Sequence, residues 1–202
     1  MSADHEHAGA KPASAPAARA AALEALLVGK GIVATDVIDA VVDTYEREVG
    51  PQTGARAVAR AWVDPAFEER LLADGTAALA ELGIGGIEGE NMRVVENTPE
   101  VHNAVVCTLC SCYPWPVLGI PPVWYKSPPY RSRVVREPRA VLAEMGLELP
   151  EGQRIRVWDS SAHVRYLVLP QRPAGTEDLA EGELAALVTR DCMIGVAVPV
   201  AP

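Results

Sequence analysis

Residues 101–112 read VHNAVVCTLCSC and join a strand pattern to a cluster of cysteines. The apolar run that ends at Val106 predicts a β-strand, which delivers the chain directly into the cluster. Three of the four cysteines, Cys107, Cys110 and Cys112, fall inside six residues with the spacing C-x-x-C-x-C. Thiols packed this tightly usually hold a metal, because thiolates repel one another unless a cation neutralises them. The stretch therefore predicts a strand that ends in a metal-binding loop.

The alternation Cys110-Ser111-Cys112 offers donors that a zinc loop does not normally need. It allows the backbone nitrogens of Ser111 and Cys112 to face the same ion as the two flanking sulfurs, in a planar N2S2 set with Cys107 in an axial position. Amide nitrogens bind a metal only when deprotonated, which favours a trivalent ion, Co(III) or Fe(III), over tetrahedral zinc. Such a set leaves an octahedral ion with an open site, which suggests water activation.

A second interpretation of the cluster stays open. The three cysteines form a zinc site if His102 or His163 supplies the fourth ligand, and the chain is then a zinc-binding interaction module rather than an enzyme. A redox C-x-x-C motif is disfavoured, because Pro114 and Pro116 block the helix that normally follows such a motif.

Composition excludes several classes of partner. The chain has 202 residues and a formal net charge of −9, which argues against nucleic acid. It has no apolar run of about 18 residues, so no membrane span is expected. Residues 1–17 lack the apolar core of a secretion signal, and the clustered cysteines do not form a disulfide framework. We therefore expect a cytoplasmic protein.

The first part of the chain is predicted to be helical. Residues 1–17 are rich in Ala, Pro, Ser and Gly and are expected to form a disordered tail. Apolar spacing and capping residues then predict helices over 18–30, 35–49, 53–63 and 64–82. These helices carry little apolar mass, so we expect residues 18–82 to form an arm that wraps a partner.

The remainder, residues 83–202, is predicted to be a metal-binding α/β or α+β domain with a mixed sheet. Strands are expected at 92–96, 101–106, 154–158 and 164–169, and helices at 137–145 and 181–189. Between them, prolines from Pro114 to Pro129 predict an irregular, rigid segment that braces the cysteine loop. The arginines there, Arg131, Arg133, Arg136 and Arg139, are expected to make ion pairs and subunit contacts.

Residues 106–119, VCTLCSCYPWPVLG, resemble the metal-binding motif of nitrile hydratase alpha subunits. The resemblance runs from about Leu26 to Gly195, and it continues through 94–103, 121–127, 130–139, 156–160 and Arg190-Asp191. It implies a helical arm followed by a four-layer α-β-β-α domain. It also implies a separate beta subunit, in an αβ or α2β2 assembly, which supplies arginines and pocket aromatics.

The resemblance implies one low-spin Co(III) or Fe(III) per chain, bound by the thiolates of Cys107, Cys110 and Cys112 and the amides of Ser111 and Cys112. In the family, the cysteine matching Cys110 is a sulfinate, that matching Cys112 a sulfenate, and that matching Cys107 a thiolate. Thr108 and Tyr113 match the cobalt-type members. A metallochaperone is expected to load the ion.

The implied reaction is hydration of a nitrile to an amide. The sequence leaves three routes open: a metal-bound nitrile, a metal-bound hydroxide, or the Cys112 sulfenate as nucleophile. Trp115 matches a substrate-pocket residue, with a bracing core tryptophan as the alternative. Glu88 stands where the family often has Gln, and its role as a proton acceptor or a solvated charge stays open. The cobalt subunit of thiocyanate hydrolase is the second candidate enzyme.

Overall fold

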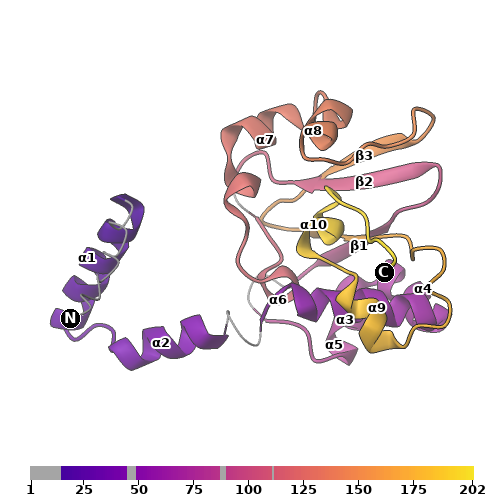
Figure 1. The fold of residues 1–202 in the computed structure, drawn as a ribbon. Coiled ribbons are helices and arrows are strands. Elements are labelled where there is room, and N and C mark those ends of the chain that lie inside the picture. Colours follow the sequence, from indigo (N-terminus) through magenta and orange to yellow (C-terminus); the bar gives the residue numbers. More distant parts are fainter. Residues whose placement is uncertain (1–14, 45–48, 87–89, 111) are drawn as a thin grey trace, which may run out of the picture. The chain divides into compact units, whose positions relative to one another are not determined.

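The computed structural model describes residues 15–44, 49–86, 90–110 and 112–202 (Figure 1). The chain divides into two compact units, Met1–Asp43 and Thr44–Pro202. The first contains α1 (Ala15–Gly29) and α2 (Thr35–Asp43). These helices confirm the predicted starts near residues 18 and 35. The predicted tail up to residue 14 and the end of the second helix, residues 45–48, lie outside the described residues.

The second unit starts before the predicted domain boundary at Gly83. Its helices α3 (Pro51–Val63), α4 (Pro65–Ala73) and α5 (Gly75–Glu81) all contribute buried residues to the core. The buried face of α3 consists largely of alanines, among them Ala57, Ala59 and Ala61, whereas α4 buries Phe67 and Leu71. Small side chains let helices approach closely, so a modest apolar mass is enough to build this layer. Whether residues 18–82 contact another subunit stays a prediction.

The single helix expected over 64–82 is wrong, because the chain forms two helices there. Asp74 interrupts the helix with extended backbone, and its carboxylate accepts a hydrogen bond from Ala77 N at 3.0 Å. Asp64 caps α4 in the same way, through Ala66 N and Phe67 N. Each aspartate satisfies backbone N–H groups that would otherwise lack partners at a helix start.

The second unit contains two small parallel sheets, each of two strands. Strand β1 (Met92–Glu96) pairs with β4 (Arg165–Leu169), and β2 (Val101–Val106) pairs with β3 (Arg154–Asp159). The four predicted strands are therefore confirmed. The register sets Val106 opposite Asp159 at the carboxyl end of the second pair, where the cysteine loop begins.

Figure 1 shows the layers of the second unit. Helices α7 (Pro128–Arg133) and α8 (Pro138–Glu144) cover the β2–β3 pair, which lies above the β1–β4 pair. Helices α3 to α5 and α9 (Glu181–Ala186) lie on the far side. The arrangement confirms the α/β fold class with helices outside the strands. The described strand pairings are all parallel.

The proline-dense segment contains short helices where the sequence predicted irregular chain. They are α6 (Trp115–Leu118), the 3-10 helix η2 (Val123–Lys126) and α7. Prolines lie in the first turns of α6 and α7, where the missing N–H costs no hydrogen bond. Over residues 114–129, proline was weighed as a helix breaker, although Pro65 was expected in the first turn of a helix on the same physical ground.

The carboxyl end adds α10 (Arg190–Ile194), which the sequence analysis did not predict. Gly195 ends this helix with a left-handed φ of 85°, and a Cβ on this residue would clash with the backbone of Asn103 and Ala104. The close approach packs α10 against β2. His102 of β2 also bonds the Gly195 carbonyl, with 2.8 Å between Nε2 and the oxygen.

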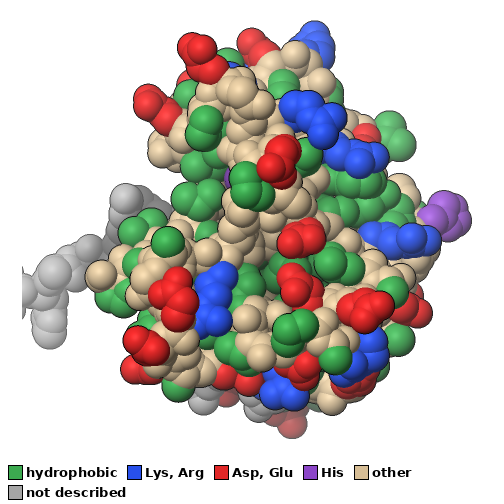
Figure 2. Space-filling view, turned by 90° about the vertical axis from the view of Figure 1, so that its right-hand side faces the viewer, with side chains coloured by type: hydrophobic (Ala, Val, Ile, Leu, Met, Phe, Trp, Pro, Cys, Tyr) green, Lys and Arg blue, Asp and Glu red, His purple; other side chains and the backbone are tan. Residues whose placement is uncertain are grey.

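Acidic and basic side chains lie close together across the lower half of the face in Figure 2. Ion pairs on the helical layer include Arg70–Glu81 at 2.9 Å and Arg60–Asp64 at 3.1 Å. Within the described ranges, none of the helices is long and apolar enough to cross a membrane.

Candidate metal centre

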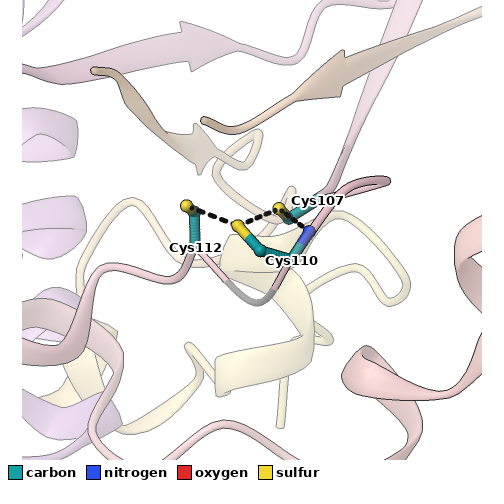
Figure 3. Close-up of side chains that lie close together, drawn as sticks. All are labelled: Cys107, Cys110 and Cys112. Atoms are coloured by element: carbon teal, nitrogen blue, oxygen red, sulfur yellow. Dashed lines mark hydrogen bonds between the residues drawn. The ribbon is translucent and has the colours of Figure 1, made fainter. Parts of the chain in front are cut away.

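Three cysteine sulfurs meet where β2 ends. Cys110 Sγ lies 3.2 Å from Cys107 Sγ and 3.0 Å from Cys112 Sγ (Figure 3). The three sulfurs all lie within 4.8 Å of one another. Cys107 follows directly from the last residue of the strand, and the sulfur of Cys110 lies between those of Cys107 and Cys112 (Figure 3). The predicted convergence of the cysteines is therefore present in the fold.

The sulfurs differ in burial. Cys107 is 1% exposed and Cys112 9% exposed, whereas Cys110 is exposed. Burial, followed by the hydrogen bond with Cys110 and the charges of both neighbouring cysteines, raises the pKa of the Cys112 thiol to about 12. Three sulfurs so close together cannot ionise without a cation between them. The cluster therefore fits a metal ion, which would stabilise all three thiolates at once.

Asp159 holds the first turn of the loop. It ends β3 and accepts hydrogen bonds from Thr108 N at 2.9 Å and from Thr108 Oγ1 at 2.5 Å. The strand register explains this contact, since Asp159 lies opposite Val106. Thr108, which the sequence analysis selected as a cobalt-type marker, therefore anchors the loop to the neighbouring strand.

Arg131 of α7 contacts the same turn. Its Nη2 donates to Thr108 O at 2.9 Å and to Leu109 O at 3.3 Å. Sequence reasoning missed both Arg131 and Asp159 as parts of the site, because they lie 22 to 51 residues from their partners. The run of four arginines indicated that this segment makes polar contacts, but the spacing of the arginines did not reveal which one reaches the loop.

Two buried tyrosines fix the backbone before and after the loop. Tyr130 donates to Val105 O at 2.7 Å, and Tyr125 donates to Cys112 O at 3.1 Å. Their rings belong to a cluster that includes Trp124, whose ring centroid lies 4.9 Å from that of Tyr130. The short helices after the cysteines thus brace the loop, as the sequence predicted for this segment.

Tyr113 and Trp115 follow the last cysteine. Tyr113 is fully buried, and burial raises the pKa of its hydroxyl while nearby Arg190 acts in the opposite direction. Its ring packs edge-on against Tyr125 at 5.0 Å between centroids. Trp115 is half-buried at the start of α6 and packs on the core, with Lys126 Nζ 5.9 Å from the centroid of its ring.

Of the remaining candidates, the two histidines are described and neither joins the cluster. Ser111 and Glu88 lie outside the described residues. His102, a possible zinc ligand, is buried and bonds Gly195 O and Asn97 instead. His163 is exposed in the turn between β3 and β4. Of the described residues, the group able to hold a metal consists of the three cysteines.

An α/β domain that gathers three thiols at a strand end is typical of proteins with a thiolate metal centre. The sequence matches the family model described as nitrile hydratase, alpha chain, over residues 14–197. The chain therefore belongs to the nitrile hydratase alpha-chain family, as the motif at 106–119 predicted.

Similar proteins include both metal types and a related hydrolase. The low-molecular weight cobalt-containing nitrile hydratase subunit alpha of Rhodococcus rhodochrous is 63% identical over 92% of this chain and 90% of its own length. Thiocyanate hydrolase subunit gamma of Thiobacillus thioparus is 48% identical, over 77% of this chain and 68% of its own length. Among solved structures, a double mutant of the Fe-type nitrile hydratase of Comamonas testosteroni Ni1 has a TM-score of 0.85 at 46% identity, covering 92% of this chain and 90% of that one.

Proposed function

We propose that this chain is the catalytic alpha subunit of a cobalt nitrile hydratase, which hydrates nitriles to amides together with a beta subunit. One Co(III) per chain would be held by the sulfurs of Cys107, Cys110 and Cys112 and the amide nitrogens of Ser111 and Cys112. The assembly would be an αβ pair or an α2β2 heterotetramer. The convergence of three sulfurs at the end of β2 carries this proposal.

The sulfur separations support an octahedral ion over tetrahedral zinc. With metal–sulfur bonds of about 2.3 Å, sulfurs in tetrahedral positions lie roughly 3.8 Å apart, and sulfurs at a right angle lie roughly 3.3 Å apart. Two of the three observed separations, 3.2 and 3.0 Å, are closer to the right-angle spacing, and the third pair of sulfurs lies within 4.8 Å. The engagement of His102 elsewhere also removes one of the two histidines that the zinc interpretation requires.

Several observations favour cobalt over iron as the metal. Thr108 and Tyr113 match the cobalt-type pattern of the family. Thr108 makes two hydrogen bonds to Asp159, and Tyr113 is buried against Tyr125. The relative at 63% identity is named as cobalt-containing, whereas the iron-type structure is 46% identical. Iron is therefore the less favoured alternative.

The exposure of the sulfurs supports the proposed oxidation pattern of Cys110 sulfinate, Cys112 sulfenate and Cys107 thiolate. Cys110 is exposed, Cys112 is 9% exposed and Cys107 is 1% exposed. Susceptibility of a cysteine to oxidation rises with exposure and thiolate character. The most oxidised sulfur in the proposal is thus the most accessible one.

The chemistry that cobalt supplies when bound is Lewis acidity toward a nitrile or toward water. The chain's own residues shape the site around it. Asp159, Tyr125 and Tyr130 fix the backbone of the loop, so the sulfurs stay in place without reorganisation during the reaction. The half-buried Trp115 offers an aromatic wall directly after the loop, which suits a small nitrile. Glu88 is proposed as a second pocket residue, with its role left to experiment.

Thiocyanate is the second candidate substrate, because the thiocyanate hydrolase subunit is also a relative. The lower identity and the smaller covered share of that relative favour the nitrile. Both substrates carry a C≡N group, so the same centre suits either one.

The decisive experiment is metal and mass analysis of the protein produced with its beta subunit and, where required, a metallochaperone. We expect one cobalt per chain and a gain of three oxygens on the peptide that contains Cys107 to Cys112. One zinc per chain with unmodified cysteines would instead identify an interaction module. Assays with a nitrile and with thiocyanate separate the two enzymes, and activity of this chain without a partner would contradict the two-subunit proposal.

A further inference from the structure

Arg131 contacts two consecutive carbonyl groups of the turn that leads to Cys110. Its Nη2 bonds the carbonyl oxygens of Thr108 and Leu109 at 2.9 and 3.3 Å. The other arginines of this run bind elsewhere: Arg133 pairs with Glu137 and Glu144, Arg136 bonds Ser132 O, and Arg139 bonds the carbonyls of Leu149, Pro150 and Gln153.

The guanidinium of Arg131 is directed at the loop rather than at a carboxylate. Its Nε is buried and has no hydrogen-bond partner among the described residues. The ion pairs found in the described ranges include Arg133 but not Arg131. The positive charge of Arg131 is therefore not offset by a bonded carboxylate there, and it acts on the two carbonyl groups that it contacts.

The peptide group between Leu109 and Cys110 links Arg131 to a sulfur of the metal centre. Its carbonyl oxygen accepts the hydrogen bond from Arg131, and its N–H donates to Cys107 Sγ at 3.3 Å. A cation at the carbonyl end of a peptide draws electron density away from its nitrogen, which makes the N–H a stronger donor. Hydrogen bonds to a sulfur ligand withdraw charge from that sulfur and tune the metal that it binds.

We propose that Arg131 is a positioning residue that tunes the metal centre through this peptide group. It fixes the turn that presents Cys110, and it strengthens the hydrogen bond to Cys107, the sulfur that stays a thiolate in the proposed centre. Asp159 holds Thr108 through different atoms of the same turn, so the two residues have separable effects. The inference rests on the proposed cobalt centre.

The test uses the full complex with its beta subunit and compares Arg131→Gln and Arg131→Lys with the control Arg136→Gln. The control removes an arginine of the same segment whose side chain bonds the Ser132 carbonyl and, among the described residues, no atom of the cysteine loop. The readouts are cobalt per chain and the sulfur-to-cobalt charge-transfer absorption, normalised to bound cobalt. Loss of an outer-shell partner typically lowers metal affinity about 10- to 100-fold, so a reduced cobalt content is expected for Arg131→Gln.

The absorption band gives the sharper result, because it does not depend on how much cobalt is loaded. A weaker hydrogen bond raises the energy of the sulfur electrons, so the band of Arg131→Gln is expected at longer wavelength. Arg131→Lys retains the positive charge but carries one ammonium group in place of the planar guanidinium. Its absorption band is therefore expected between those of Arg131→Gln and the unaltered protein. Arg136→Gln is expected to match the unaltered protein in both readouts.

Bands of both Arg131 variants that coincide with the band of the unaltered complex would overturn the inference. If Arg131→Gln does not fold, the Lys variant decides alone, since a shifted band supports the proposal and an unshifted band refutes it. Absence of cobalt from the unaltered complex would instead contradict the proposed function. The two failures are therefore distinguishable.

Discussion

At the scale of single residues, the contact between Thr108 and Asp159 couples a strand end to the cysteine loop. The threonine hydroxyl and backbone N–H both donate to one carboxylate. Replacement of Thr108 by Val removes one of these bonds, whereas Ser retains it. A hydrogen bond of this kind contributes about 0.5–1.5 kcal/mol to stability.

We therefore expect Thr108→Val to lower the free energy of unfolding by about 1 kcal/mol, with Thr108→Ser close to the unaltered protein. Urea unfolding of the two variants measures the difference. A loss of stability in Thr108→Ser with none in Thr108→Val would show that the methyl group, and not the hydroxyl, makes the contact that matters.

His102 makes stability depend on pH. Burial lowers the pKa of this histidine below its usual value of 6.5, although the bond to Gly195 O opposes the shift. The unfolded chain therefore takes up a proton near pH 6.5 while the folded chain does not. The stability gained from the neutral histidine is fully present above that pH and is lost as pH falls below it.

Urea unfolding at a series of pH values from neutrality downward is expected to show falling stability in this window. His102→Gln serves as the control and is expected to flatten the slope just below pH 6.5. A slope that is unchanged in His102→Gln would assign the pH dependence to other groups.

At the scale of elements, the packing of α10 on β2 depends on one glycine. Gly195 and Gly146 both have left-handed backbone, with φ of 85° and 92°. A Cβ on Gly195 would clash with Asn103 and Ala104, whereas a Cβ on Gly146 meets no atom within 4 Å. The pair therefore separates backbone strain from steric overlap.

We expect Gly146→Ala to cost about 1–2 kcal/mol from the backbone conformation alone. Gly195→Ala is expected to cost roughly 1–3 kcal/mol more, because the added methyl overpacks the contact between α10 and β2. Thermal or urea unfolding of both variants tests the difference. Similar losses for the two would mean that α10 shifts freely away from the strand.

Some helices and strands of this protein can be predicted from local sequence patterns, and others cannot. The strand over 101–106 was predictable, because its apolar run is followed at once by the cysteines. Helix α10 was not predictable from local pattern, since it has only five residues, Arg190–Ile194, and depends on contacts with β2. The split between α4 and α5 was overlooked because Asp74 acts as a cap only once its carboxylate meets Ala77 N.

At the scale of the whole molecule, large apolar side chains are exposed on the cysteine loop and on η2, which contacts the loop through Tyr125. Leu109 is 88% exposed and Val123 is 90% exposed. Large apolar side chains left this open are common where a partner binds. We therefore expect Val123→Asp to weaken association with the beta subunit, because assembly would bury the new charge.

Sedimentation or size-exclusion measurement of the purified complex tests this expectation. Val200→Asp, at a residue 73% exposed near the carboxyl end, is the matched control. Both substitutions lie on the surface and are expected to change the stability of the chain itself by no more than about 0.5 kcal/mol. Equal assembly of Val123→Asp and the unaltered protein would place Val123 outside the interface.

The sequence by itself determined the three cysteines, their spacing and the strand that leads into them. These features can be predicted because metal-ligand spacing and strand periodicity depend only on about a dozen consecutive residues. The tertiary structure alone decided that Asp159 and Arg131 hold the loop, and that Cys110 is exposed while Cys107 is buried. These features arise when parallel strand pairing and helix packing bring distant segments together, and no local pattern encodes which atoms then meet.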